Sequence, residues 1–136
     1  MPGLADAEIL GLVHTAGCVD AVLGASRAGF SFSVGHGLGT PDDPTFLGMH
    51  DAAVLIAGGS VAVARAIARG EVDRAVTFCG GLHHASADDA AGFCVDNGAA
   101  PAVAALVQAG LRTVAYVDVD PRVLTVSLYR SLKVRR

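Results

Sequence analysis

Two apolar, strand-like runs near the end of the chain are joined by a very short connection, and this spacing restricts the possible folds. The runs are Thr113–Val119 and Val123–Leu128, with only Asp120–Arg122 between them. Parallel strands in one sheet need a crossover connection of about a dozen residues or more. If the first run lies in a parallel sheet, the second therefore cannot lie parallel beside it, and it must pair elsewhere, turn back or stay loose.

Helical and strand-like patterns alternate along the rest of the chain. A buried-type strand is expected over Arg74–Phe78, and Gly29–Pro44 has the composition of a long irregular loop. This alternation predicts one α/β domain over residues 1–136 with a mainly parallel sheet. The predicted helices are Ala5–His14, Val19–Ser26, His50–Arg69 and Ala99–Ala109. The core side chains expected on the third of these helices are Val54, Leu55, Val61, Val63 and Ile67.

Composition excludes several classes of protein. The net charge of −3 and the absence of a basic run with interleaved aromatic residues argue against nucleic-acid binding. The apolar runs Ala52–Ala64 and Asn97–Leu111 are shorter than the ~18–20 residues of a membrane-spanning helix. Three cysteines without CxxC spacing are typical of a reduced protein, so we expect a cytoplasmic location, with Cys79 and Cys94 buried.

A tandem histidine pair follows the expected strand over 74–78, in the segment Gly80-Gly81-Leu82-His83-His84. Asp118 and Asp120 alternate at the end of the strand over 113–119, so both acids project to one face. Because ligands bind at the carboxyl ends of parallel strands, both groups should reach one edge of the sheet. They form either an acid/base or metal site, or a set of turn and helix-capping residues without catalytic function.

These segments resemble the zinc-dependent deacetylases, the family of histone deacetylases and acetoin-utilisation deacetylases. Gly80–Asn97 is similar to the family block of two glycines, two histidines, alanine and a later Gly-Phe-Cys…Asn motif. Arg112–Asp120 is similar to the family strand that follows this block, and Gly37-Leu38-Gly39 resembles the loop at the rim of the acyl-lysine tunnel. The resemblance covers nearly the whole chain and implies an arginase-like, three-layer α/β/α fold.

The resemblance implies a catalytic role for four residues. His84 matches the general base that activates zinc-bound water. His83 matches the neighbouring charged histidine that stabilises the oxyanion, and Asp118 matches the carboxylate that orients it. Asp120 matches the first of three zinc ligands. The implied reaction is metal-assisted hydrolysis of acetyl-lysine or a related acylated amine.

Other matched residues belong to the implied substrate tunnel. Phe93 matches a tunnel wall, and Gly81 matches a glycine beside the catalytic channel. Asp42 matches a rim acid that holds the substrate backbone, although the neighbouring Asp43 leaves the register open. His14 and His50 are expected to have structural roles at helix ends.

The chain departs from the family pattern directly after Asp120. There the family has His-His-Gly-Asp-Gly, which supplies the second zinc ligand, whereas this chain continues with Pro121-Arg122. The third ligand and the catalytic tyrosine lie further downstream in the family than Arg136. Zinc is thus the implied cofactor, but one ligand of three does not hold it. Ser127 and Leu128 match residues whose backbone lines a monovalent-cation site in the family, but the short connection Asp120–Arg122 removes the parallel strand position on which that match depends.

We therefore expect an incomplete, internally deleted family domain with little or no deacetylase activity. Its exposed sheet edges would favour self-association. Two alternatives remain, a non-catalytic module that binds acyl-lysine or a protein, and a gene remnant without function. Ordering of the loop Gly29–Pro44 over His83, His84 and Phe93 without metal would favour the binding module.

Overall fold

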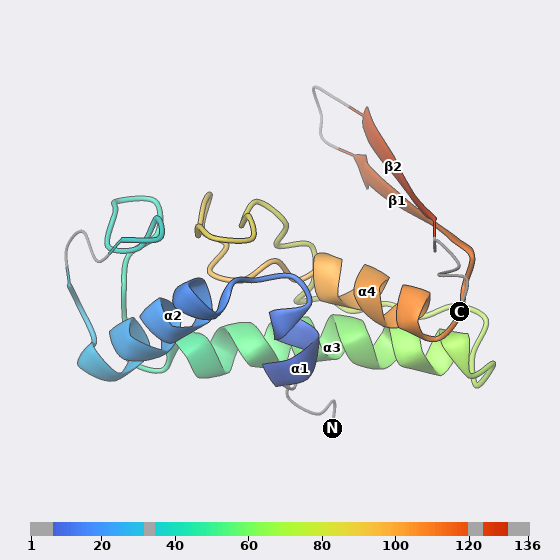
Figure 1. Ribbon diagram of the computed structural model, residues 1–136, viewed down its shortest axis with the longest axis horizontal. Helices are drawn as coiled ribbons and strands as arrows, with labels where there is room; N and C mark the ends of the chain where they lie inside the picture. Colours follow the sequence, from blue (N-terminus) through green and yellow to red (C-terminus); the bar gives the residue numbers. More distant parts are fainter. Residues whose placement is uncertain (1–6, 32–34, 120–123, 131–136) are drawn as a thin grey trace, which may run out of the picture.

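Helix α3 (Met49–Ala68) is the longest element of the described structure, and the other helices pack along it (Figure 1). The computed structural model describes residues 7–31, 35–119 and 124–130. Helix α4 and helix α2 contact α3, and α1 contacts α4. The other helices are α1 (Ala7–Gly11), α2 (Ala16–Ala28) and α4 (Ala100–Gln108). The strands are β1 (Thr113–Val119) and β2 (Leu124–Arg130).

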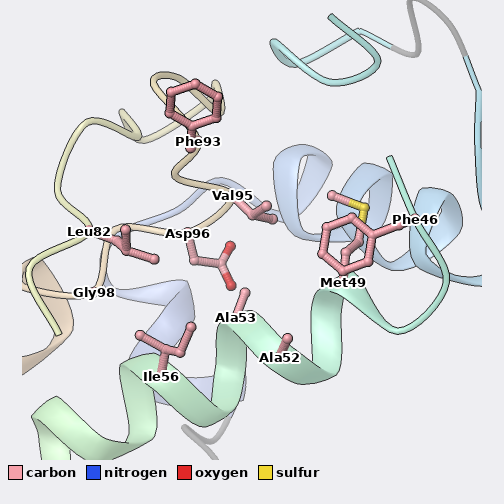
Figure 2. A pocket seen from close by; sticks show the side chains of 10 residues that line it. All are labelled: Phe46, Met49, Ala52, Ala53, Ile56, Leu82, Phe93, Val95, Asp96 and Gly98. Carbon is pink, nitrogen blue, oxygen red and sulfur yellow. The ribbon is translucent and has the colours of Figure 1, made fainter. Parts of the chain in front are cut away.

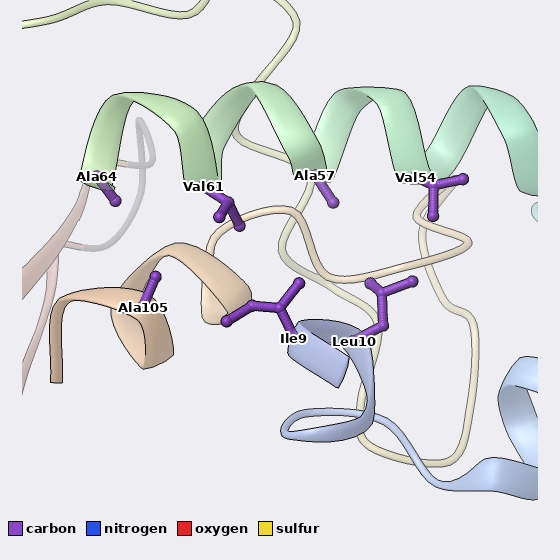
Figure 3. Packing of buried hydrophobic residues seen from close by; sticks show 7 residues of the cluster. All are labelled: Ile9, Leu10, Val54, Ala57, Val61, Ala64 and Ala105. Atoms are coloured by element: carbon purple, nitrogen blue, oxygen red, sulfur yellow. The ribbon is translucent and has the colours of Figure 1, made fainter. Parts of the chain in front are cut away.

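One stripe of small and branched side chains on α3 forms the main core (Figure 3). Val54, Ala57, Val61 and Ala64 recur at helical spacing and are buried against α1 and α4. The partners from those helices are Ile9, Leu10 and Ala105. Leu55 and Ile67, which were expected in the core, lie off this stripe and are 49% and 38% exposed.

The glycine pair in the middle of α3 lets other segments approach the helix closely. Gly58 is buried, and a Cβ added to Gly59 would lie 3.4 Å from the hydroxyl of Thr77. The chain that leads to the histidine pair therefore lies against this part of α3. By length and mean hydropathy α3 also satisfies the criteria for a membrane span, as core helices of soluble proteins often do.

A second core cluster lies where α2 meets the N-terminus of α3. Cys18 and Val22 of α2 pack there against Leu38, Met49 and Ala90. Helix α2 begins earlier than the sequence pattern predicts, because the Thr15 hydroxyl accepts a hydrogen bond from the backbone N–H of Cys18. This cluster connects the glycine-rich loop to the helical layer.

Strands β1 and β2 form an antiparallel pair, in the register Thr113↔Arg130 to Val119↔Leu124. Of the arrangements open to the second strand, the structure therefore has the one in which the chain turns back. The side chains of Val117, Val119, Val126 and Leu128 are all more than half exposed. The hairpin extends away from the helices (Figure 1). These exposed side chains form an apolar face on it.

The strand predicted over Arg74–Phe78 is absent from the structure. These residues have no strand assignment, and Val76 and Phe78 are 76% and 97% exposed. An extended segment becomes a strand only when a neighbour completes its hydrogen bonds, and here β1 pairs with β2. Cys79, which was expected to be buried, is exposed in the same segment. Within the described ranges the only sheet is antiparallel, and a three-layer parallel arrangement remains a prediction.

We predict that Val61→Ala lowers the free energy of unfolding by about 2 kcal/mol, because it removes a buried side chain from the main core. Val76→Ala is the matched control, since the same atoms are lost from an exposed position. The control should change stability by less than about 0.5 kcal/mol. Urea denaturation followed by circular dichroism measures both, and equal losses would contradict the packing described for α3.

Candidate active site

The ring of His83 is held between two side chains of β1. Its Nε2 lies 3.2 Å from the carboxylate Oδ2 of Asp118, and its Nδ1 lies 3.1 Å from the hydroxyl of Tyr116. Tyr116 and Asp118 are two residues apart on a strand, so their side chains project to the same face. The expectation that the histidine segment and the end of this strand meet is therefore confirmed for His83 and Asp118.

Both ring nitrogens of His83 lie against a polar side chain of β1. Burial raises the pKa of the Tyr116 hydroxyl, and the charge of Asp118 raises it further, so this hydroxyl keeps its proton. When the ring is neutral with its proton on Nε2, that N–H faces the Asp118 carboxylate and the Tyr116 hydroxyl donates to Nδ1. Neither ring nitrogen of His83 is left free for a ligand.

His84 is exposed and lies beside His83, with ring centroids 4.5 Å apart and planes inclined by 54°. Its other neighbour is Gly92, where an added Cβ would come within 3.0 Å of the His84 ring. Gly92 and Phe93 both have positive φ, of 56° and 65°. The turn at Gly92 therefore makes room for the His84 ring.

Asn97 holds the histidine segment to the rest of the protein. Its side-chain amide donates to the carbonyl oxygens of His83 and Ala85, at 2.8 and 2.9 Å. Its side-chain oxygen accepts from the backbone N–H groups of Ala99 and Ala100, at the start of α4. Asn97 thus caps α4 and fixes the backbone around the histidines. The Gly-Phe-Cys…Asn motif contains this residue, but the sequence pattern did not reveal its bonds.

A buried acid, Asp96, lies next to Asn97 and was missed by the sequence analysis. It is 5% exposed, and its Oδ2 has no hydrogen-bond partner among the described residues. Burial raises the pKa of this carboxyl, while nearby His14 and His50 act in the opposite direction. His14 is itself buried and accepts a hydrogen bond from the backbone N–H of Asn97 at 3.1 Å, in agreement with its expected structural role.

The glycine-rich loop packs on the segment that follows the histidines. His36 O accepts a hydrogen bond from the backbone N–H of Ala90 at 2.9 Å, and a Cβ at Gly37 would lie 2.1 Å from Ala90 O. In the described part of this loop, the contacts reach 88–93 and do not extend over His83.

Asp42, the predicted rim acid, and its neighbour Asp43 lie in different environments. Asp42 is exposed, whereas Asp43 is buried with the backbone N–H groups of Phe93 and Gly92 beside its carboxyl. Burial raises the pKa of Asp43, and those N–H groups oppose this rise. Asp42 therefore stays the predicted rim acid, while Asp43 faces the turn at Gly92.

A cavity of about 210 Å³ lies beside the contact between His83 and Asp118. Asn97, Ala100, Val103 and Ser127 line it together with His83, Tyr116 and Asp118. Phe93 lies in the wall of a different cavity, and Gly81 is exposed with a φ of 93°. The structure therefore joins His83 and Asp118 in one site, but it does not bring Phe93 into that site.

The described residues do not fit a zinc site. Among residues 7–31, 35–119 and 124–130, no group of three His, Cys, Asp or Glu side chains is arranged to hold a metal ion. Asp120, the expected ligand, lies outside these ranges. We therefore derive no catalytic step through zinc.

Comparisons with known proteins point to one family. The family model described as "Histone deacetylase domain" matches residues 2–131. The chain is 39% identical over 121 residues to the acetoin utilization protein AcuC of Bacillus subtilis, and this match covers 88% of the chain and 31% of the relative. It is 33% identical to histone deacetylase 6 of Arabidopsis thaliana, with 88% of the chain and 26% of that protein covered.

A solved structure agrees with these relatives. The crystal structure of an HDAC homolog complexed with SAHA matches with a TM-score of 0.70 and 28% identity, over 82% of this chain and 30% of that chain. This match supports an α/β fold of the arginase/deacetylase type. The chain spans less than a third of the length of these relatives.

We predict that Asn97→Ala lowers the free energy of unfolding by about 2–3 kcal/mol, because it removes the α4 cap and leaves the carbonyls of His83 and Ala85 without this donor. Gln108→Ala, which removes an exposed amide near the end of α4, is the control and should cost less than about 0.5 kcal/mol. Urea denaturation measures both changes. A cost below about 0.5 kcal/mol for Asn97→Ala would contradict the proposal that Asn97 links the histidine segment to α4.

Proposed function

Because the chain belongs to the histone deacetylase family, we propose that it carries the histidine-pair part of a site for acylated amines and, by itself, hydrolyses them little or not at all. The observation that carries this proposal is the arrangement of His83, with Asp118 on one ring nitrogen and Tyr116 on the other. His83 and Asp118 resemble the family's acid/base machinery. The described residues contain no group of three side chains that could hold a metal ion.

The proposed roles follow from what each side chain can reach. Asp118 orients the His83 ring, and the ring of His84 is exposed beside it, where a substrate could reach it. His83 could donate to a developing oxyanion only if it gave up its contact with Tyr116 or Asp118. In the described structure His83 is therefore not a ready donor to the transition state, which supports low activity.

The substrate class in this proposal is acetyl-lysine or a smaller acylated amine. Zinc is the metal expected where all the metal ligands of the family are present. The relatives named above include an acetoin utilization protein and a histone deacetylase, so both substrate types are consistent with the family. All three cysteines are free in the structure, which supports a reducing, cytoplasmic setting as part of the proposal.

A second candidate function is non-catalytic binding of an acyl-lysine side chain. The cavity of about 210 Å³ beside His83 supports it, because this space combines apolar walls with the polar groups of Tyr116, Asp118 and Asn97. The exposed apolar face of the hairpin supports self-association or binding of a partner protein. A gene remnant is the third possibility, and resequencing across Asp120–Pro121 tests it directly.

We predict that the purified 136-residue chain contains far less than one zinc per molecule and does not hydrolyse an acetyl-lysine peptide. Metal analysis by mass spectrometry and a fluorogenic deacetylase assay measure these two properties, with His84→Ala as the matched control. Near-stoichiometric zinc, together with hydrolysis that is lost in His84→Ala, would overturn the proposal of an inactive chain.

For the binding function, we predict that the cavity beside His83 takes up Nε-acetyl-lysine methylamide with a Kd on the order of millimolar, as expected for a small ligand in an open cavity. Shifts in the NMR spectrum should centre on Tyr116 and Asn97, and Tyr116→Phe should weaken binding about tenfold by removing one hydroxyl. Binding that is absent, or unchanged by Tyr116→Phe, would exclude this cavity as the acyl-lysine site.

A further inference from the structure

A second cavity, separate from the His83 site, lies between α3 and the segment 93–98 (Figure 2). Its volume is about 120 Å³, and it shares no lining residue with the cavity beside His83. Ala52, Ala53 and Ile56 of α3 form its floor, and Leu82 and Val95 form its walls. Phe46 and Phe93 lie at its exposed side, since they are 49% and 71% exposed.

Asp96 is the one charged residue that lines this cavity. Figure 2 shows its carboxylate pointing toward α3, above Ala53. The side chain is 5% exposed, and its Oδ2 is buried without a hydrogen-bond partner in the described structure. A buried carboxylate oxygen without a donor is costly, so a donor bound in the cavity would stabilise it.

The neighbouring histidines do not supply that donor. His14 uses its Nε2 to accept a hydrogen bond from the backbone N–H of Asn97. The Nδ1 atoms of His14 and His50 are buried and have no hydrogen-bond partner among the described residues, so neither atom donates to Asp96.

We propose that this cavity binds a compact primary alkylammonium group. The ammonium would donate to the Asp96 carboxylate, and the alkyl chain would lie against the apolar side chains of Met49 and Ile56. Phe46 and Phe93 present aromatic rings at the exposed side, where they favour a cation over an anion. A cavity of this size has room for a ligand of only a few heavy atoms.

Other ligand classes fit less well. An anion would be repelled by the buried carboxylate, and a bare metal ion would find no group of three suitable donors among the described residues. A neutral ligand would fill the cavity but leave the charge of Asp96 uncompensated. The shared chemistry of a primary ammonium occurs both in free small amines and in lysine side chains, and the experiment separates the two.

The test titrates n-butylammonium into the full chain at pH 8 and follows the amide signals of Asp96 and Gly98 by NMR. Asp96→Asn is the matched variant, because it keeps the side-chain shape and removes the charge. Saturable binding that weakens at least tenfold in Asp96→Asn, while butan-1-ol behaves alike in both proteins, is expected. Equal binding of n-butylammonium to both proteins, or no binding to the wild type, would overturn the proposal.

A second measurement uses the wild-type chain alone, in case Asp96→Asn does not fold. The carbon chemical shift of the Asp96 carboxyl reports its titration, and n-butylammonium should move the midpoint to lower pH because the cation favours the charged form. An unchanged midpoint at saturating ligand would overturn the proposal. Comparable binding of Nα-acetyl-lysine N-methylamide, whose side-chain ε-ammonium is free, would identify lysine side chains as ligands, whereas binding of n-butylammonium alone would identify free amines.

Discussion

The side chain of Asn97 is the junction on which the arrangement of the site depends. One amide group binds the backbone of the histidine segment and also caps α4, so it couples two parts of the chain that the sequence separates. Helix α4 contacts both α3 and β1. Asn97 therefore sets the position of His83 relative to α4. Strand β1, which follows α4, brings Tyr116 and Asp118 to the His83 ring.

Much of the fold could be predicted where local pattern and tertiary packing agree. The range Thr113–Val119 was predicted as it is found in β1, and α3 differs from its predicted range by one residue at each end. The expected strand over 74–78 fails because a strand is defined by its neighbour, and no local pattern contains that information. The exposed Leu55 shows the same limit, since apolarity alone does not say which stripe of a helix is covered.

The candidate site could be predicted only in part, for a related reason. His83 and Asp118 meet as the spacing and the family resemblance suggested. Tyr116 and Asp96 were missed because Tyr116 resembles any strand residue and Asp96 any loop acid until burial is known. The two cavities are also invisible in the sequence, because their walls come from helix, loop and strand residues far apart along the chain.

The close approach at Gly37 limits which sequences are compatible with this loop. Any side chain there would place a Cβ within 2.1 Å of a backbone oxygen, and backbone atoms cannot move aside as a flexible side chain can. Gly35, two residues earlier, meets nothing within 4 Å, although it also has a positive φ. A library of variants in this loop should therefore accept asparagine or aspartate at position 35 and keep only glycine at position 37.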